Sequence, residues 1–181
     1  KVLKETNQYE NTIVLFLSDN GASRQGSNGG LRGYKAGVYE GGSRVPAILS
    51  YPNVVKNGIE NDQTILTMDV LPTLLDFIGK EPSLANLDGI SIKDNILGNA
   101  PLPKRDVFFE FGNKSFIRSG DWKMVRIKSE NGDTIELYNL SNDLQESDDR
   151  SADNPELLNK LKSKLSNWEK EVKKGVNMIS E

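Results

Sequence analysis

The sequence predicts an α/β segment followed by a small α+β subdomain, and three observations support this fold class. A continuous apolar and β-branched run at residues 12–18 has the composition of a strand covered on both faces in a mostly parallel sheet. Short strand-like segments between residues 106 and 138 are separated by turn residues, as in an antiparallel meander. An apolar stripe at helical spacing begins after Pro155. We therefore expect two domains, at residues 1–100 and 101–181.

In the first domain, the apolar run at Thr12–Ser18 has one comparable partner, at Pro46–Tyr51. We expect the two to be parallel, as neighbouring strands of an α/β sheet. Such a pair leaves its faces and edges uncovered, so further strands and helices are expected upstream of Lys1. Apolar residues at helical spacing predict a helix over Thr67–Ile78 that packs on the sheet and ends at Gly79.

The second domain is predicted to be an antiparallel four-stranded sheet closed by a C-terminal helix. Its expected strands are residues 106–111, 115–118, 122–128 and 134–138. Gly, Asn, Asp and Ser residues between them supply the turns. Asn154 and Pro155 predict the N-cap and first position of the closing helix, which would lie across the sheet. We expect Trp122 in the core, where aromatic area contributes most.

Composition excludes several classes of function. The 181 residues carry 23 Lys and Arg against 26 Asp and Glu, a net charge of −3, so a basic nucleic-acid-binding surface is not expected. The chain has no cysteine and no histidine, which rules out disulfides, thiolate metal sites and histidine acid–base chemistry within it. The longest apolar run, Ile13–Leu17, is far shorter than the ~20 residues that span a bilayer. Any chemistry must use carboxylates, amides, hydroxyls, Lys or Arg.

Three motifs follow one another in the first domain: Leu-Ser-Asp-Asn-Gly at 17–21, Leu-Arg-Gly-Tyr-Lys at 31–35 and Glu-Gly-Gly-Ser-Arg-Val-Pro at 40–46. In this order they resemble the sulfatase family, within the alkaline-phosphatase-like superfamily. Arg-Ser-Gly-Asp-Trp-Lys at 118–123 and Glu-Leu-Tyr-Asn-Leu at 136–140 continue the resemblance. It implies that the first domain is the C-terminal part of an alkaline-phosphatase-like α/β/α sandwich, and that the second is the small subdomain that follows it.

Asp19 and Asn20 stand where the first strand opens into a loop, so their side-chain oxygens can point beyond the carboxyl edge of the sheet. Both are hard oxygen donors of the kind that Ca²⁺ binds, but Ca²⁺ takes about six to eight ligands and two residues cannot complete the shell. By themselves these residues also fit an ordinary tight turn. The resemblance assigns Asp19 and Asn20 as ligands of a divalent cation, usually Ca²⁺ with Mg²⁺ as the alternative, together with Asp residues from the N-terminal half of the family's domain.

Lys35 lies in a glycine-rich context that leaves a long cationic arm free to reach an anion. An ammonium near the oxygens of a sulfate ester would balance the charge that develops on the leaving oxygen. The alternative is an ordinary solvated Lys. A nucleotide P-loop is not predicted, because Gly33-Tyr34-Lys35-Ala36 lacks the Gly-Lys-Ser/Thr core. The resemblance makes Lys35 the catalytic and substrate-contacting lysine.

Four residues of the third motif are predicted to be structural. Glu40 and Arg44 flank Gly41-Gly42, and a partly buried ion pair between them would fix the loop that bears Lys35. The glycines would supply backbone angles that other residues avoid. In the second domain, Asn113 and Lys114 are candidates for substrate contact from their loop position alone. Many sulfatases place a His in this region, and this chain has none.

The resemblance implies that the complete enzyme hydrolyses sulfate esters with a formylglycine hydrate, made from the Cys or Ser of a Cys/Ser-x-Pro-x-Arg motif. That motif does not occur in this chain. We therefore expect a C-terminal segment that is inactive alone and works with the N-terminal part of the sulfatase domain on a sulfated small molecule or a sulfated glycan. Sulfatases are often periplasmic, secreted or lysosomal, which is what the resemblance implies for the compartment.

Three alternatives stay open. A phosphate or phosphonate ester hydrolase of the same superfamily would use the same metal and Lys arrangement. A non-catalytic carbohydrate-binding or assembly fragment would keep the scaffold without the nucleophile. A self-contained domain with no ligand site is disfavoured by the apolar strand at Ile13–Leu17, which needs neighbours.

Overall fold

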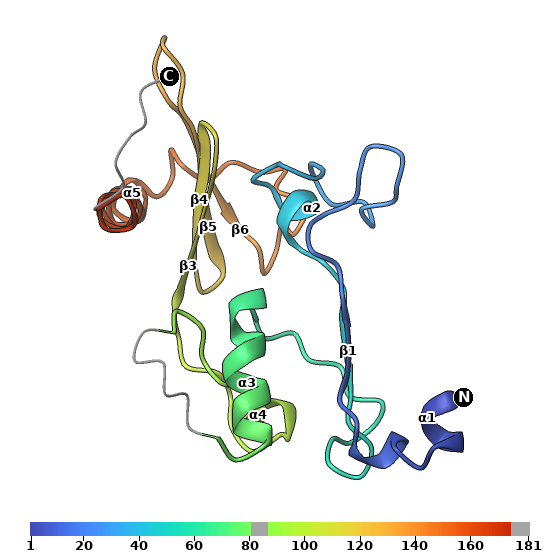
Figure 1. The fold of residues 1–181 in the computed structure, drawn as a ribbon. Helices are drawn as coiled ribbons and strands as arrows, with labels where there is room; N and C mark the ends of the chain where they lie inside the picture. Colours follow the sequence, from blue (N-terminus) through green and yellow to red (C-terminus); the bar gives the residue numbers. More distant parts are fainter. Residues whose placement is uncertain (81–86, 175–181) are drawn as a thin grey trace. The chain divides into compact units, whose positions relative to one another are not determined.

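The computed structural model describes residues 1–80 and 87–174. The described chain divides into two compact units (Figure 1). The first unit combines Lys1–Asp19 with Pro46–Pro103, and the second combines Asn20–Val45 with Lys104–Glu181. The loop segment that carries most of the predicted site thus groups with the C-terminal sheet. The predicted division into domains at residues 1–100 and 101–181 stays a prediction.

The first unit opens with a short helix and contains a two-stranded sheet. The elements are α1 (Val2–Glu5), the 3₁₀ helix η1 (Tyr9–Asn11), β1 (Val14–Leu17) and β2 (Ala47–Ser50). The prediction of parallel pairing is wrong, because β1 and β2 run antiparallel, with Val14 opposite Ser50 and Leu17 opposite Ala47. An apolar run predicts a buried strand but does not indicate whether that strand runs parallel or antiparallel to its neighbour. A parallel connection usually needs a long crossover helix, whereas the segment between these strands contains only a four-residue helix.

One face of the β1–β2 pair is apolar and open. Phe16 and Ile48 lie directly opposite each other and are each 64% exposed, and Val14 shares their face. Aromatic and branched residues at such positions normally pack against a covering layer. The prediction that the strand needs further neighbours is consistent with this exposure.

The predicted helix at Thr67–Ile78 is confirmed, with a tighter first turn. It consists of the 3₁₀ helix η2 (Thr67–Asp69) and α3 (Val70–Phe77), and Gly79 follows with a φ of 66°. The buried carboxylate of Asp69 accepts hydrogen bonds from the N–H groups of Leu66 at 2.8 Å and Ile90 at 3.0 Å, so it ties this turn to the segment before α4 (Lys93–Ile96). Among the apolar residues that predicted the helix, three are exposed, namely Met68, Leu71 and Ile78.

The second unit confirms the predicted meander and closing helix. Its elements are α2 (Glu40–Ser43), β3 (Asp106–Phe111), β4 (Lys114–Ser119), β5 (Trp122–Ile127), β6 (Thr134–Asn139) and α5 (Pro155–Val172). The strands are antiparallel and ordered β3-β4-β5-β6. Asn154 stands at the N-cap position of α5, but its side chain donates to the carbonyl oxygen of Arg150 at 3.0 Å and makes no cap hydrogen bond.

Helix α5 covers one face of this sheet, which we call the α5 face. The buried cluster there is apolar and consists of Ile117, Met124, Leu137, Leu161 and Leu165. Phe108 stacks on Trp168 with ring centroids 5.2 Å apart, and Trp122 packs against the cluster as predicted. Burial of this apolar surface is the main force that holds the helix on the sheet.

The opposite face of the sheet carries buried polar residues and contacts the segment around α2, so we call it the α2 face. Lys123 and Tyr138 are paired across β5 and β6 and are 0% and 2% exposed. Their sequence neighbours Met124 and Leu137 belong to the α5 face, because successive strand residues point to opposite sides. Figure 1 shows α5 and α2 on different sides of the strands. In the described part of the chain, no helix is long and apolar enough to cross a membrane.

Candidate functional site

The structure distributes the predicted site residues over both units. Asp19 is exposed and follows β1. It is the last residue of the segment Lys1–Asp19 of the first unit. Asn20, its neighbour in the chain, opens the second unit and is half-buried. Lys35, Glu40 and Arg44 also belong to the second unit. All the predicted site residues except Asp19 therefore lie in the second unit.

The glycine pair Gly41-Gly42 of α2 forms the centre of the loop segment. The N–H of Gly41 donates to the carbonyl oxygen of Arg32 at 2.7 Å, and the N–H of Gly21 donates to that of Gly42 at 3.0 Å. A Cβ atom on Gly42 would lie 2.5 Å from the carbonyl oxygen of Gly37. Backbone atoms pack so closely on both glycines that no side chain fits. This close approach is why glycine is required at both positions.

Lys35 lies beside this centre with an anchored backbone and an exposed side chain. Its N–H donates to the carbonyl oxygen of Ala22 at 2.9 Å, two residues after Asn20. Gly33 and Ala36, on either side of it, have φ values of 84° and 65°. The ammonium of Lys35 makes no hydrogen bond or ion pair within residues 1–80 and 87–174. The loop thus presents a cation whose main chain is fixed and whose side chain can still take an anionic partner.

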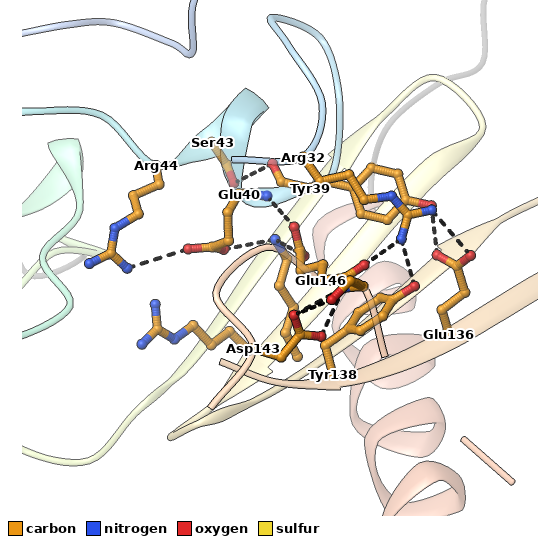
Figure 2. Close-up of polar contacts among 12 residues, drawn as sticks. Arg32, Tyr39, Glu40, Ser43, Arg44, Glu136, Tyr138, Asp143 and Glu146 are labelled. Atoms are coloured by element: carbon orange, nitrogen blue, oxygen red, sulfur yellow. Dashed lines mark hydrogen bonds and ion pairs between the residues drawn. The ribbon is translucent and has the colours of Figure 1, made fainter. Parts of the chain in front are cut away.

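The expected ion pair between Glu40 and Arg44 is present at 3.5 Å, but it is one part of a larger buried cluster (Figure 2). The ammonium of Lys123 lies 2.8 Å from Glu40 Oε1 and 2.9 Å from Glu146 Oε1. The N–H of Glu40 donates to Glu146 Oε2 at 2.6 Å. Burial raises the pKa of Glu146 above its usual value, against the nearby charge of Lys123.

Arg32, from the second motif, forms a separate clamp on the same face of the sheet. Its Nη1 donates to the hydroxyl of Tyr138 at 2.7 Å and to the carbonyl oxygen of Glu146 at 2.8 Å. Its Nη2 donates to the hydroxyl of Tyr39 at 3.0 Å, and the guanidinium lies 3.7 Å from the centre of that ring. The Tyr39 hydroxyl in turn donates to Glu136 at 2.6 Å, as Figure 2 shows.

Both clamp tyrosines stay protonated at neutral pH. Burial raises the pKa of Tyr138 to about 12, and burial together with the hydrogen bond to Glu136 raises that of Tyr39 further. Neutral hydroxyls can donate and accept at once, so Tyr39 connects the Arg32 guanidinium to the Glu136 carboxylate. Arg32 itself is 3.5 Å from Glu136. This contact was not predicted, because Arg32, Glu136 and Tyr138 stand in two separate sequence motifs and Tyr39 stands in neither.

Asn113 lies in the β3–β4 turn, after Gly112 with its φ of 59°, and Lys114 is the first residue of β4. The side-chain amide of Asn113 donates to the carbonyl oxygen of Lys128 at 2.8 Å, so it closes the end of the sheet. Arg118 is the β4 residue that pairs with Lys123. Lys114 lies four residues before Arg118, so the two are about 13 Å apart along the strand. These two residues are therefore not brought to the end of the sheet that holds α2, and their substrate role stays a prediction from loop position.

The donor set for a metal is incomplete within this chain. The carboxylate of Asp19 and the amide oxygen of Asn20 fit a hard cation such as Ca²⁺ or Mg²⁺ by their chemistry. No group of three or more His, Cys, Asp or Glu residues that could hold a metal ion occurs among the residues that the structure describes. That further ligands come from outside this chain stays a prediction from the sequence.

Comparison with known proteins gives a consistent result. The sequence model of the family described as Sulfatase matches residues 1–80. A protein named Sulfatase from Formosa agariphila is 32% identical over 182 residues, covering 88% of this chain and 33% of the relative. An Arylsulfatase from Hemicentrotus pulcherrimus is 35% identical over 128 residues, covering 67% of this chain and 23% of the relative. The chain thus spans a third or less of these two curated relatives.

Solved structures agree with the relatives. The crystal structure of Ps i-CgsB matches with a TM-score of 0.82 and 28% identity, covering 92% of this chain and 38% of that chain. A phosphonate monoester hydrolase of Agrobacterium radiobacter matches with a TM-score of 0.70 and 22% identity, covering 91% and 36%. The second likeness shows the shared fold alone. The fold of this chain is therefore found within larger proteins.

Proposed function

Because the chain belongs to the sulfatase family, we propose that the complete protein hydrolyses a sulfate ester and that this chain supplies its leaving-group cation and part of its metal site. Lys35 is the proposed catalytic and substrate-contacting residue. The observation that carries the proposal is the loop geometry: the Lys35 backbone is bound to Ala22, while its ammonium is exposed and unpaired within the described residues.

In the proposed reaction, the ammonium of Lys35 approaches the oxygens of the sulfate ester and balances negative charge as the bond from sulfur to the leaving oxygen breaks. A fixed cation is effective here because it requires no reorganisation when the charge develops. Asp19 and Asn20 are the proposed ligands of a divalent cation, Ca²⁺ or Mg²⁺. When bound, that cation would add positive charge beside the sulfate oxygens.

The nucleophile and the remaining metal ligands are proposed to come from residues outside this chain. The nucleophile expected from the family is a formylglycine hydrate. Two features support an N-terminal partner segment: the apolar face with Phe16 and Ile48 is open, and Leu71 of α3 and Ile78 directly after it are exposed. Both faces would be covered by further strands and helices of the sulfatase domain. We therefore propose that this chain alone is inactive.

The proposed substrate is a sulfated small molecule or a sulfated glycan. Ps i-CgsB, which is similar over most of this chain, has also been solved in complex with k-i-k-neocarrahexaose. The relatives include proteins named arylsulfatase and steryl-sulfatase. An anionic sulfate group is the feature that Lys35 would recognise in each case.

The test uses the complete protein with matched aryl sulfate and aryl phosphate substrates. We expect turnover of the sulfate to exceed that of the phosphate, and Lys35→Ala to lower kcat/KM for the sulfate by about 10²- to 10³-fold, the usual effect of removing one charge-stabilising donor. Lys56→Ala, an exposed Lys in the other unit, is the matched control. Faster phosphate turnover would favour the phosphate or phosphonate ester hydrolase. No turnover of either would favour the non-catalytic binding fragment.

A further inference from the structure

Lys123 and Glu146 are the most deeply buried charged groups that contact α2. The side chain of Lys123 is fully buried, and it lies between the carboxylates of Glu40 and Glu146. Placing one ammonium and two carboxylates out of water is costly, and an apolar replacement of similar volume often stabilises a fold as well or better. The other face of the same sheet does use apolar packing. The ions of the α2 face are therefore suited to fixing one particular position of α2.

A continuous set of contacts leads from this cluster to Lys35. Glu40 is the first residue of α2 and is held by both Lys123 and Glu146. Gly41 follows and binds the carbonyl oxygen of Arg32 through its N–H. Gly42 packs on the backbone of Tyr34, which precedes Lys35, and of Gly37, two residues after Lys35; an added Cβ would lie 2.6 Å and 2.5 Å from their carbonyl oxygens.

The same contacts reach Asn20 from the other side of the glycine pair. The N–H of Gly21 donates to the carbonyl oxygen of Gly42, and Ala22 accepts the N–H of Lys35. An added Cβ on Gly21 would lie 2.7 Å from the Cα of Gly42. Backbone atoms beside Lys35 and beside Asn20 thus rest on the two glycines of α2. A shift of α2 must move them, because closely packed backbone cannot deform independently.

We propose that Lys123 and Glu146 are positioning residues of the sulfatase site: by holding Glu40, they fix α2 and so set the positions of Lys35 and Asn20. This inference rests on the proposed function of Lys35 and Asn20. Arg32 supports the same placement through Tyr138 and the Glu146 carbonyl. Neither Lys123 nor Glu146 touches substrate in this scheme, since Lys123 is fully buried and acts through α2 alone.

The test replaces Lys123 by Met in the complete protein and follows kcat and KM per folded molecule. We expect kcat/KM for the aryl sulfate to fall by about ten- to a hundredfold, because a displacement near 1 Å can lower a rate about a hundredfold. Lys164→Met is the matched control, since it breaks a 2.6 Å pair with Asp106 that faces α5. We expect its kcat and KM to stay within about twofold of wild type. Unchanged kcat and KM in folded Lys123→Met would overturn the proposal.

A double-mutant cycle separates positioning from general stability. If Lys123 acts through Lys35, Lys123→Met causes a smaller further loss in the Lys35→Ala background than in the wild-type background. Losses that add in full would overturn the proposed route. The cycle is informative because the two side chains are not in contact and can couple only through the loop.

A second variant covers the case in which Lys123→Met does not fold. Lys123→Met/Glu146→Gln removes one charge of each sign, so Glu40 keeps Arg44 as its partner, and the amide oxygen introduced at position 146 can still accept the N–H of Glu40. We expect hydrogen exchange of the Lys35 and Gly41 amides to accelerate by about tenfold or more, while the amides of β4 and α5 keep their protection.

The exchange measurement also separates this inference from the proposed function. If the wild-type protein hydrolyses no sulfate ester, the proposed function fails, and exchange at Lys35 and Gly41 still shows whether Lys123 fixes the loop. Unchanged exchange at these two amides in the double variant would overturn the positioning role. Uniform acceleration over β4 and α5 as well would also overturn it, because the cluster would then support only the fold.

Discussion

The two faces of the β3–β6 sheet hold their covering segments by different kinds of contact. On the α5 face, Met124 and Leu137 pack against apolar helix residues. On the α2 face, their sequence neighbours Lys123 and Tyr138 bind a carboxylate pair and a guanidinium. Apolar burial is non-directional and tolerates small shifts, whereas hydrogen-bonded charges define a position. The same strands thus hold helix α5 by buried apolar area and the segment around α2 by directional polar contacts.

The comparison also predicts how each face fails. Contacts on the α5 face are numerous and individually weak, so a truncation leaves a cavity but keeps the remaining contacts. On the α2 face one ammonium lies between two carboxylates, and its removal leaves Glu40 and Glu146 buried side by side with only the 3.5 Å contact of Arg44 to Glu40. We expect the α2 face to be the more sensitive of the two to a single substitution.

The largest expected effect is that of Lys123→Met on stability. Removal of one partner from a buried ion cluster usually lowers the free energy of unfolding by about 3–5 kcal/mol. The measurement is urea unfolding of the complete protein, followed by a probe in the second unit. Lys164→Met, whose partly exposed pair faces α5, should change that free energy by only about 0–1 kcal/mol. Equal effects of the two variants would remove the distinction between the faces.

Leu165→Ala tests the α5 face in the same assay. Leu165 is fully buried in the apolar cluster, so its truncation should lower the free energy of unfolding by about 2–5 kcal/mol. Unlike Lys123→Met, it should leave the relative exchange rates of the Lys35 and Gly41 amides unchanged in the folded protein. Selective exposure of those amides by Leu165→Ala would show that the two faces do not act separately.

Much of the fold could be predicted because its signals are local. Turn residues between strand segments predicted the meander, and the observed strands differ from the predicted ranges by one residue at most at their ends. Asn154 and Pro155 predicted the start of α5 correctly. The direction of the β1–β2 pair could not be predicted, because apolar content is the same in parallel and antiparallel strands.

The candidate site was predictable only at residues that stand in local sequence motifs. Lys35 and the Glu40–Arg44 pair stand in recognisable motifs. The buried partners of Glu40 lie about 80 to 110 residues away in sequence, and no local periodicity links Lys123 or Glu146 to α2. One usable signal was the position of Lys123 between apolar neighbours in a predicted strand, since a charge at an inward position needs a partner.

Gly42→Ala should break the link between the α2 face and the loop without changing any charge. The added methyl group would lie 2.5 Å from the carbonyl oxygen of Gly37, so the backbone beside Lys35 must move. We expect a loss of about 1–3 kcal/mol in the free energy of unfolding, the usual effect of overpacking. Ser43→Ala, in the same helix, is the control, and its loss should be smaller because it removes one long hydrogen bond of 3.2 Å. A Gly42→Ala protein as stable as wild type would show that the close approach is not needed.

The smallest expected effect is a pH dependence of opposite sign on the two faces. Burial raises the pKa of Glu146 on the α2 face. On the α5 face, burial opposes ionisation of Glu169, but the hydrogen bond and charge of Arg126 outweigh it and hold the pKa of Glu169 below its usual value. A raised carboxyl pKa means that the folded state binds the proton more tightly than the unfolded state, and a lowered pKa means the reverse.

Each Glu→Gln variant, compared with wild type, reports how the stability that its carboxyl group contributes changes with pH. The stability that Glu146 contributes is present below its unfolded pKa of about 4.3 and is lost as pH rises through its higher folded pKa. The stability that Glu169 contributes is present above about pH 4.3 and is lost as pH falls through its lower folded pKa. The free energy of unfolding of wild type minus Glu146→Gln should therefore fall with rising pH, while wild type minus Glu169→Gln should rise. Differences of the same sign would mean that Lys123 neutralises Glu146 as fully as Arg126 neutralises Glu169, and the α2 face would then be an ordinary ion pair network.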